Sequence, residues 1–216
     1  QRINGIRKPH VYVWGTGFIN YSDADGKFFK RNMEFCAVRG ELTRKNVERM
    51  TGKKMDIPMA DAGILASELL KERPEVCYDV GVVPHLCDLK DPVVEKLLAS
   101  YDNAKFINVK DDPLQVVKEI AECRYIISSS LHGLIVADSL GIPNMYLVFG
   151  DRLLGDGYKF EDYYSAYGVE AQPRDLRTEK APELTEIEEQ YQILPEMVEE
   201  KKHQMKTAFP YPVKNR

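Results

Sequence analysis

Three consecutive hydroxyl side chains followed by a histidine form the segment with the clearest chemical potential. Ser128, Ser129 and Ser130 come directly after the apolar run 125–127, which predicts a strand, and His132 follows two residues later. In an open parallel sheet, ligands bind beyond the carboxyl ends of the strands. The position of these residues therefore predicts a site for a small polar ligand, with the serines as candidate contacts.

The residues after the serines predict a helix over 131–140, for which Ser130 is well placed as the N-cap. The backbone N–H groups of Leu131, His132 and Gly133 then lack helical partners and lie at the positive end of the helix dipole, which suits an anion. His132 can donate to a phosphate or carboxylate, or move a proton near neutral pH. A capped helix with a purely structural histidine explains the same local pattern, so the pattern alone leaves both interpretations open.

Two cationic residues are candidates for holding the same anion. Arg39 follows the predicted strand 34–38 and precedes Gly40, an arrangement that allows an anion to approach closely. Its alternative role is an ion pair with Glu34 or Glu41. Lys159 adds a second positive charge to the site or is an ordinary solvated lysine.

Two other loops also follow predicted strands. Gly15, Thr16 and Gly17 follow the strand 10–14 and permit close ligand approach, although they lack the full dinucleotide-binding pattern. Asp61 is a candidate both for a helix cap and for a residue that faces a cleft.

His85 and Asp88 follow the predicted strand 79–83, and they either bind a second substrate or order their loop. A metal site made of Cys77, His85 and Cys87 lacks a fourth ligand, so no metal is expected. The four cysteines form no CxxC pair and lie in apolar stretches, as reduced thiols of a cytoplasmic protein do.

Composition excludes several classes of protein. The 34 acidic and 30 basic residues give a net charge of −4, so no overall basic excess points to nucleic acid. No apolar run reaches the roughly 18 residues of a transmembrane helix. The N-terminus has no apolar signal-peptide core.

The sequence predicts short apolar strands at 10–14, 34–38, 55–59, 79–83, 105–109, 125–127 and 145–149. They alternate with predicted helices that include 43–50, with Thr43 as a candidate cap, 92–100 and 113–121. This alternation predicts an α/β fold with parallel sheets. We expect two Rossmann-like halves that face a cleft, with the N-terminal half truncated. The predicted divisions are 1–74, 75–180 and a helical tail over 181–216, with the first boundary at Pro74.

Six segments, in this order, resemble the polysaccharide pyruvyl transferases: VWGTGF (13–18), FCAVRGELT (35–43), ADAGIL (60–65), VGVVPHLCD (80–88), SSSLHGLIVADSLGIPN (128–144) and KFEDYY (159–164). The resemblance covers about residues 10 to 165. It implies a GT-B-like fold, phosphoenolpyruvate as donor, no cofactor, and a glycan precursor carried on a lipid or nucleotide as acceptor. Association with a membrane would then be peripheral, through the acceptor.

The resemblance also suggests roles for the candidate residues. His132 would act as general acid, Arg39 and the start of the helix at 130–133 would hold the donor, and Asp61 or Asp88 would deprotonate the sugar. Many relatives carry Arg where this chain has Ser130, and we expect that a segment which precedes VWGTGF in the family is missing from the N-terminal half. Two alternatives remain: a GT-B glycosyltransferase that uses a nucleotide sugar, and a non-catalytic binding protein.

Overall fold

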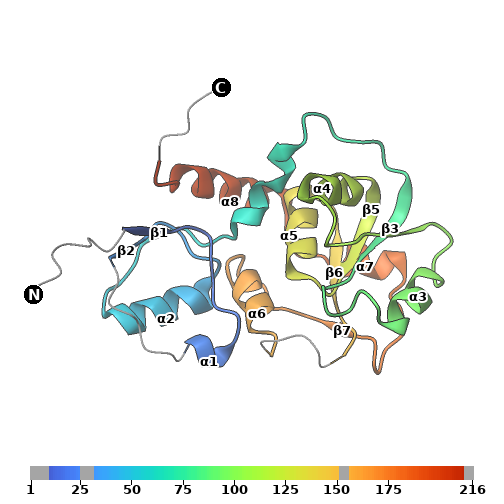
Figure 1. Ribbon diagram of the computed structural model, residues 1–216, viewed down its shortest axis with the longest axis horizontal. Helices are drawn as coiled ribbons and strands as arrows, with labels where there is room; N and C mark the ends of the chain where they lie inside the picture. Colours follow the sequence, from blue (N-terminus) through green and yellow to red (C-terminus); the bar gives the residue numbers. More distant parts are fainter. Residues whose placement is uncertain (1–9, 25–31, 151–155, 212–216) are drawn as a thin grey trace, which may run out of the picture.

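The computed structural model describes residues 10–24, 32–150 and 156–211, which form two parallel sheets joined by helices (Figure 1). The smaller sheet pairs β1 (Val11–Val13) with β2 (Met33–Phe35). Single bridges extend it from Thr16 to Val38 and from Val38 to Met59. The predicted third strand, 55–59, is therefore present only as a bridge. Two helices belong to this unit, α1 (Tyr21–Ala24) and α2 (Glu41–Thr51).

The larger sheet has the order β4-β3-β5-β6-β7, and all neighbouring strands are parallel. Its strands are β3 (Tyr78–Val83), β4 (Ala104–Phe106), β5 (Cys123–Ser128), β6 (Asn144–Val148) and β7 (Arg174–Asp175). The prediction of an α/β fold with parallel sheets is confirmed. The chain leaves β3 on one side and returns on the other at β5, so the topological switch point lies between these two strands.

Helices cover both faces of the larger sheet. One face packs against α4 (Pro113–Ala121) and α5 (Leu131–Ser139), and the other against α3 (Pro92–Leu98) and α7 (Leu184–Gln190). Asp91 and Asp112 cap α3 and α4 through their carboxylates, each followed by a proline at the first helical position. These local signals explain why the helix starts at 92 and 113 agree with the sequence prediction.

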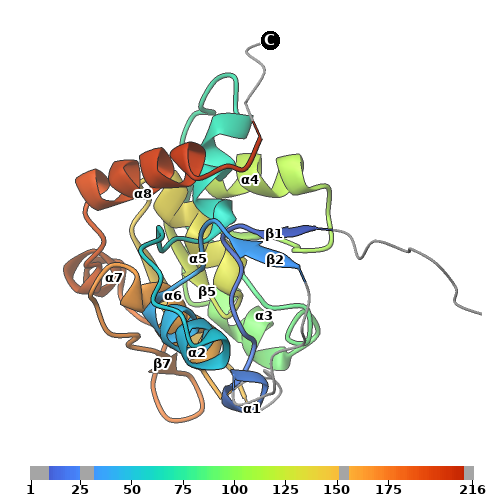
Figure 2. The same ribbon diagram turned by 90° about the vertical axis from the view of Figure 1, so that its left-hand side faces the viewer.

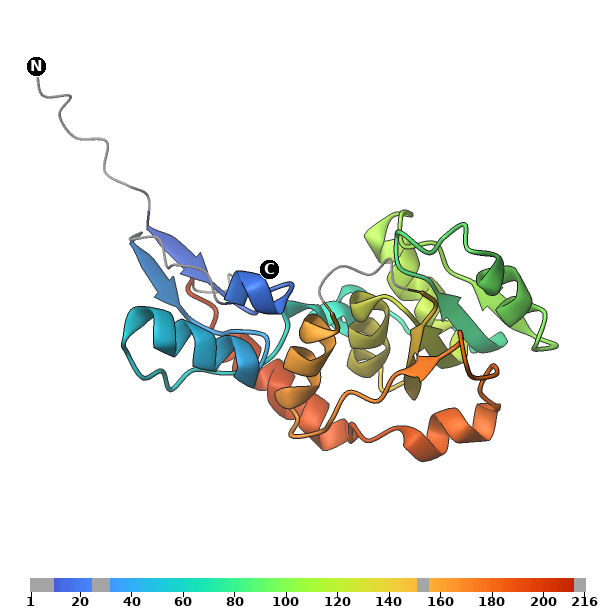
Figure 3. The same ribbon diagram turned by 90° about the horizontal axis from the view of Figure 1, so that it is seen from below.

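Three further elements join the two sheets: η1 (Ala62–Leu69), a 3-10 helix, α6 (Tyr158–Ser165) and α8 (Pro195–Thr207). Figure 3 shows α6 between the two sheets, with α8 beside the small unit and the junction. In Figure 2, α8 crosses the upper part of the molecule, above α5 and α6. One apolar core includes Ala37 of the small unit, Ile135 of α5, Phe160 of α6 and Met205 of α8. The two units therefore share a hydrophobic core.

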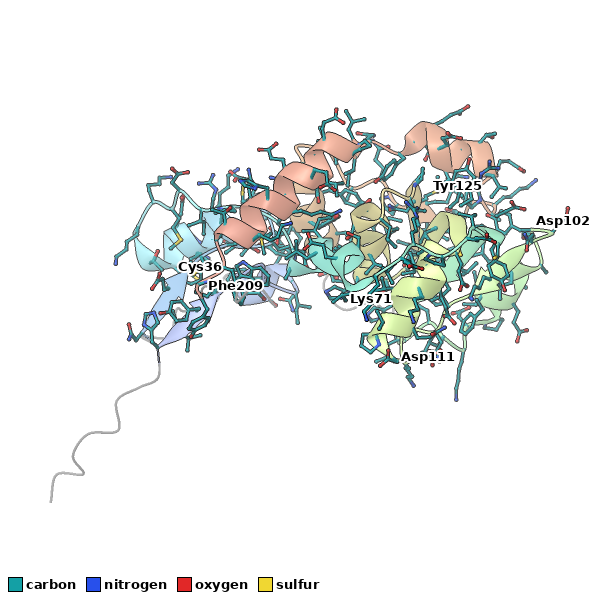
Figure 4. The ribbon with its side chains drawn as sticks, turned by 90° about the horizontal axis from the view of Figure 1, so that it is seen from above. Cys36, Lys71, Asp102, Asp111, Tyr125 and Phe209 are labelled. Atoms are coloured by element: carbon teal, nitrogen blue, oxygen red, sulfur yellow. The ribbon has the colours of Figure 1, made fainter. Side chains whose placement is uncertain are left out.

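The end of α8 also returns to the small sheet. Trp14 Nε1 donates to the carbonyl oxygen of Met205 at 2.9 Å, and its ring packs edge-on against Phe209 with centroids 4.9 Å apart. In Figure 4, Phe209 lies beside the small sheet, while Asp102 lies at the far end of the molecule. Among the described residues, no helix is both long enough and apolar enough to cross a bilayer.

A buried carboxylate of α6 caps the start of α2 from a distant part of the chain. Asp162 accepts hydrogen bonds from the amide and the hydroxyl of Thr43, both at 2.7 Å, and from Arg39 Nε at 2.9 Å. Ser165 Oγ accepts from the amide of Glu41 at 2.9 Å. The N-cap residue itself, Gly40, has no side chain to cap the helix. The predicted helix start at Thr43, with that residue as cap, is therefore wrong, because α6 supplies the acceptors.

A second buried carboxylate lies in the shared core. Asp138 is fully buried and accepts hydrogen bonds from Tyr163 (2.6 Å), Asn144 (2.6 Å) and Tyr191 (2.9 Å). Burial raises its pKa to about 6, against the lowering effect of these three donors. The carboxylate links α5, β6, α6 and the segment before α8.

Gly40 allows α6 to approach α2 closely, and this contact is testable. A Cβ at position 40 would lie 1.6 Å from the carbonyl oxygen of Asp162. We expect Gly40→Ala to lower the free energy of unfolding by about 1–3 kcal/mol, because one helix must shift. Urea denaturation measures this change. Gly150→Ala is the control, because a Cβ there would meet no atom of the described residues within 4 Å. Equal stability of the two variants would contradict the proposed contact.

Candidate active site

The loops after β3 and β5 are tied together at the switch point of the larger sheet. The His85 amide donates to Ser129 Oγ at 2.9 Å, and Ser129 Oγ donates to Asp88 Oδ2 at 2.7 Å. The Asp88 side chain is almost completely buried, with 1% of the residue exposed. Ser129 thus orders the loop that carries His85 and Asp88.

The three serines have different roles. Ser128 is fully buried, and its hydroxyl lies 2.7 Å from the carbonyl oxygen of Val83 and 2.9 Å from that of Ser130. It also accepts from the Ser130 amide at 3.0 Å. Ser130 occupies the predicted N-cap position of α5, but its side chain makes no capping hydrogen bond. The hydroxyl that supports the helix start is therefore that of Ser128.

The start of α5 presents backbone N–H groups and one exposed imidazole. The first helical hydrogen bond runs from the Leu134 amide to the Ser130 carbonyl at 3.3 Å, so the amides of Leu131, His132 and Gly133 precede it. Leu131 and Gly133 are buried, whereas His132 is exposed. A Cβ at position 133 would lie 2.5 Å from Ser128 Oγ, so the helix can approach the serines this closely only with a glycine there.

Asp61 lies close to the same helix start. Its carboxylate accepts from the Gly63 amide at 2.9 Å and caps η1, as one of the two predicted roles requires. A Cβ at Gly63 would lie 3.2 Å from Asp61 Oδ1 and 3.8 Å from the ring of His132. Asp61 and His132 therefore border the same glycine.

Lys159 approaches this region from the first turn of α6. It is half-buried, its Nζ lies 5.3 Å from the centre of the Phe160 ring, and it has no ion-pair partner within the described parts of the chain. Burial is the main cause that lowers the pKa of its ammonium group. The charges of Cys87 and Asp88 oppose this effect, and the charge of Arg39 adds to it.

The pKa of His85 is affected by the same group of charges. Its pKa is lowered mainly by burial and then by the positive charge of Lys159; Asp88 opposes the shift, and His132 adds to it. The structure thus brings together His85, His132 and Lys159 from three separate elements. The ammonium group of Lys159 and the amides that precede the first helical hydrogen bond of α5 suit an anion.

Arg39 lies at the border of this group and is mostly buried. Its Nε donates to Asp162, and its Nη2 donates to the carbonyl oxygen of Phe18. The alternative partners suggested by the sequence, Glu34 and Glu41, do not pair with it. Of the guanidinium nitrogens, Nη1 has no protein partner among the described residues.

The two glycines after β1 provide close packing. Gly15 has a φ of +73° and lies against Ala62 and Met205, and a Cβ at Gly17 would lie 2.6 Å from the Arg39 guanidinium carbon. Thr16 between them is exposed. Ligand contact by these three residues stays a prediction.

The loop after β3 also gathers three potential metal ligands. One ligand atom each from His85, Cys87 and Asp88 lies within 4.8 Å of the others. Cys77, which the sequence suggested as a partner, precedes β3, whereas His85 follows it, so the strand separates them. The sequence analysis missed Asp88 as a third ligand, although it directly follows Cys87. It also missed Asp162, which no local pattern marks as a partner of Arg39.

Fold and site together define an α/β protein with a cationic centre at the carboxyl edge of a parallel sheet. The family model described as Polysaccharide pyruvyl transferase matches residues 5–149, and the chain belongs to this family. The match includes Arg39, Asp61, the loop at 84–88 and His132, but it ends before Lys159.

Two curated relatives extend the comparison. An uncharacterised protein of Acanthamoeba polyphaga mimivirus is 34% identical over 166 residues, which are 74% of this chain and 56% of that protein. The succinoglycan biosynthesis protein ExoV of Rhizobium meliloti (strain 1021) is 22% identical over 173 residues, 78% of this chain and 51% of that protein. The chain thus spans about half the length of the curated relatives it matches.

The different roles of Ser129 and Ser130 lead to a test by stability. Ser129→Ala removes a donor from the buried Asp88 carboxylate and an acceptor from the His85 amide, so we expect a loss of about 1–3 kcal/mol. Ser130→Ala removes no hydrogen bond that the described residues make through this side chain, and should leave stability nearly unchanged. Urea denaturation of both variants measures the difference. A loss of similar size in both would contradict the assigned roles.

Proposed function

We propose that this chain carries the donor site of an enzyme that transfers a pyruvyl group from phosphoenolpyruvate to a sugar, forming a ketal. The sugar would belong to a surface polysaccharide or exopolysaccharide precursor. The observation that carries this proposal is the position of Lys159, which has no carboxylate partner among the described residues and lies within electrostatic reach of the loop that Ser129 ties to the start of α5. Membership of the family supports this type of reaction, because the description of the family names pyruvyl transfer.

The proposal includes a GT-B-like arrangement in which the two sheets are Rossmann-like halves and the junction between them is the active site. The shared core and the contacts of α6 with α2 support this arrangement. The divisions at 74 and 180 belong to the same proposal. Contacts of α8 with the small sheet and with η1 support a role for residues of the third segment in this junction.

Phosphoenolpyruvate carries a phosphate and a carboxylate, which need separate partners. Lys159 is half-buried and lacks a carboxylate partner within the described residues, so an anionic ligand would neutralise it. The amides at the start of α5 suit a phosphate. Arg39 Nη1 is a further donor, and Nε and Nη2 hold the guanidinium in place. Lys159 thus takes the role of the cation that many relatives have at the position of Ser130.

In the chemical step, the methylene carbon of the donor is protonated and its neighbouring carbon becomes oxocarbenium-like. His132 is exposed at the helix start and is the general acid in this proposal. Two sugar hydroxyls then add to that carbon in turn, and its bond to the phosphate oxygen breaks. One hydroxyl proton balances the proton given to the methyl group, and the other leaves with inorganic phosphate.

Asp61 is the base in this proposal. It borders Gly63 together with His132, and only its Oδ1 receives a hydrogen bond within the described residues. Asp88 is less suited to this role, because only 1% of the residue is exposed, against 8% of Asp61, and both of its oxygens have partners, Ser129 and Cys87.

The acceptor side of the proposal follows the family. In this proposal, a lipid-linked or nucleotide-linked sugar is the acceptor. Any contact with a membrane is peripheral and is made through the acceptor. The chemistry needs no cofactor. His85, Gly15, Thr16 and Gly17 are candidate contacts for the acceptor. A cytoplasmic location is part of the proposal, supported by four cysteines that form no disulfide.

The donor site is tested by titration of phosphoenolpyruvate into the chain and its Lys159→Met variant. Loss of one charged contact should weaken binding by about 10–100-fold. Lys201→Met is a matched control, because Lys201 is also half-buried and lies over an aromatic ring, 5.8 Å from the centre of Tyr167. Equal weakening in both variants would place the donor elsewhere. Saturable binding of a nucleoside diphosphate, with none of phosphoenolpyruvate, would favour glycosyl transfer instead.

The general acid is tested separately. His132→Gln keeps a polar side chain but cannot transfer the proton, so we expect phosphate release from phosphoenolpyruvate to slow by about 10²–10⁴-fold. The affinity for the donor should change far less, because the cations remain. Phosphate release is measured with lipid-linked and nucleotide-linked sugar acceptors. An unchanged rate in this variant would assign the proton transfer to another residue.

A further inference from the structure

The tight loop after β3 brings together three side chains with different donor atoms. His85 Nδ1 lies 3.0 Å from Cys87 Sγ, and Cys87 Sγ lies 3.5 Å from Asp88 Oδ1. The Cys87 amide points to the same ring nitrogen at 3.4 Å, which marks Nδ1 as the acceptor nitrogen of the imidazole. A nitrogen, a sulfur and an oxygen therefore lie within 4.8 Å of one another.

The surroundings fix these atoms in place. Ser129 donates to Asp88 Oδ2, so the other carboxylate oxygen is turned towards Cys87. The Asp88 amide donates to the His85 carbonyl at 2.7 Å, and this bond closes the turn that holds both residues. Hydrogen bonds of this kind orient metal-binding carboxylates in known sites.

We propose that His85, Cys87 and Asp88 bind a zinc-type divalent cation through Nδ1, Sγ and Oδ1. A mixed set of imidazole, thiolate and carboxylate suits zinc, and three protein ligands leave a fourth position open. The thiolate and the carboxylate together balance the charge of the cation. Lys159 lies within electrostatic reach of Cys87 and Asp88. Because the two negative ligands neutralise the bound cation, repulsion between the cation and Lys159 is small.

This cation site goes beyond pyruvyl transfer and does not require it. The open fourth position lies in the region where we place the donor, so a bound ion would take water or an oxygen of an anionic ligand. Metal binding would replace the contact between the His85 ring and the Cys87 thiol with two bonds to the ion. The thiol would release about one proton as the ion binds.

Titration with Co²⁺ tests the proposal, because a cobalt–thiolate bond gives a charge-transfer absorption band in the near ultraviolet. We expect one Co²⁺ per chain, displacement by Zn²⁺, and loss of the band in Cys87→Ser. Cys77→Ser is the matched control and should keep the full band, because Cys77 is exposed and precedes β3. Asp88→Asn should weaken Co²⁺ binding at least tenfold, and so should Ser129→Ala through the orientation of Asp88.

Absence of the band in the unaltered chain would overturn the proposal, and so would a band that survives Cys87→Ser. Circular dichroism of each variant distinguishes loss of the site from loss of the fold. Titration of phosphoenolpyruvate in the absence of metal is a separate measurement. A chain that binds the donor but no Co²⁺ refutes the cation site alone, and the reverse result refutes the donor site alone.

Discussion

The carboxylate of Asp162 determines how the two sheets meet. The first turn of α2 begins at a glycine and has no local side chain for its amide groups, and Arg39 has no local carboxylate partner. Asp162, a buried residue of α6, accepts hydrogen bonds from the start of α2 and also pairs with Arg39. A buried carboxylate is stable only with several donors around it, so the contact has little freedom to shift. The close approach of α6 to Gly40 restricts the contact sterically as well as electrostatically.

The position of the candidate site follows from this contact. The larger sheet alone supplies the start of α5 and the loop with His85 and Asp88. Docking of the small unit adds Arg39, and α6 adds Lys159 at the same edge. Lys159 has no carboxylate partner among the described residues, so its charge raises the affinity of the site for an anion before any ligand arrives.

Local patterns in the sequence were enough to predict the parallel α/β class and most strands of the larger sheet. They also predicted the helix starts at Pro92 and Pro113. All of these features are determined by residues that are close together in the sequence. The local patterns did not predict α6, whose polar and aromatic residues lack a clear period. They also could not identify the partner of Arg39, since Asp162 lies 123 residues away. The three serines look equivalent in sequence, yet their position at the end of a strand turns each hydroxyl in a different direction.

Lys159 and Asp162 lie three residues apart on α6, so one short helix carries both a proposed ligand contact and the contact between the sheets. Any ligand that needs Lys159 in place binds only molecules in which α6 is docked. The two equilibria are then thermodynamically linked, and the coupling free energy must be the same in both directions. Occupancy of the site would hold the sheets together more firmly, and a looser docking of α6 would lower the affinity in proportion to the undocked fraction.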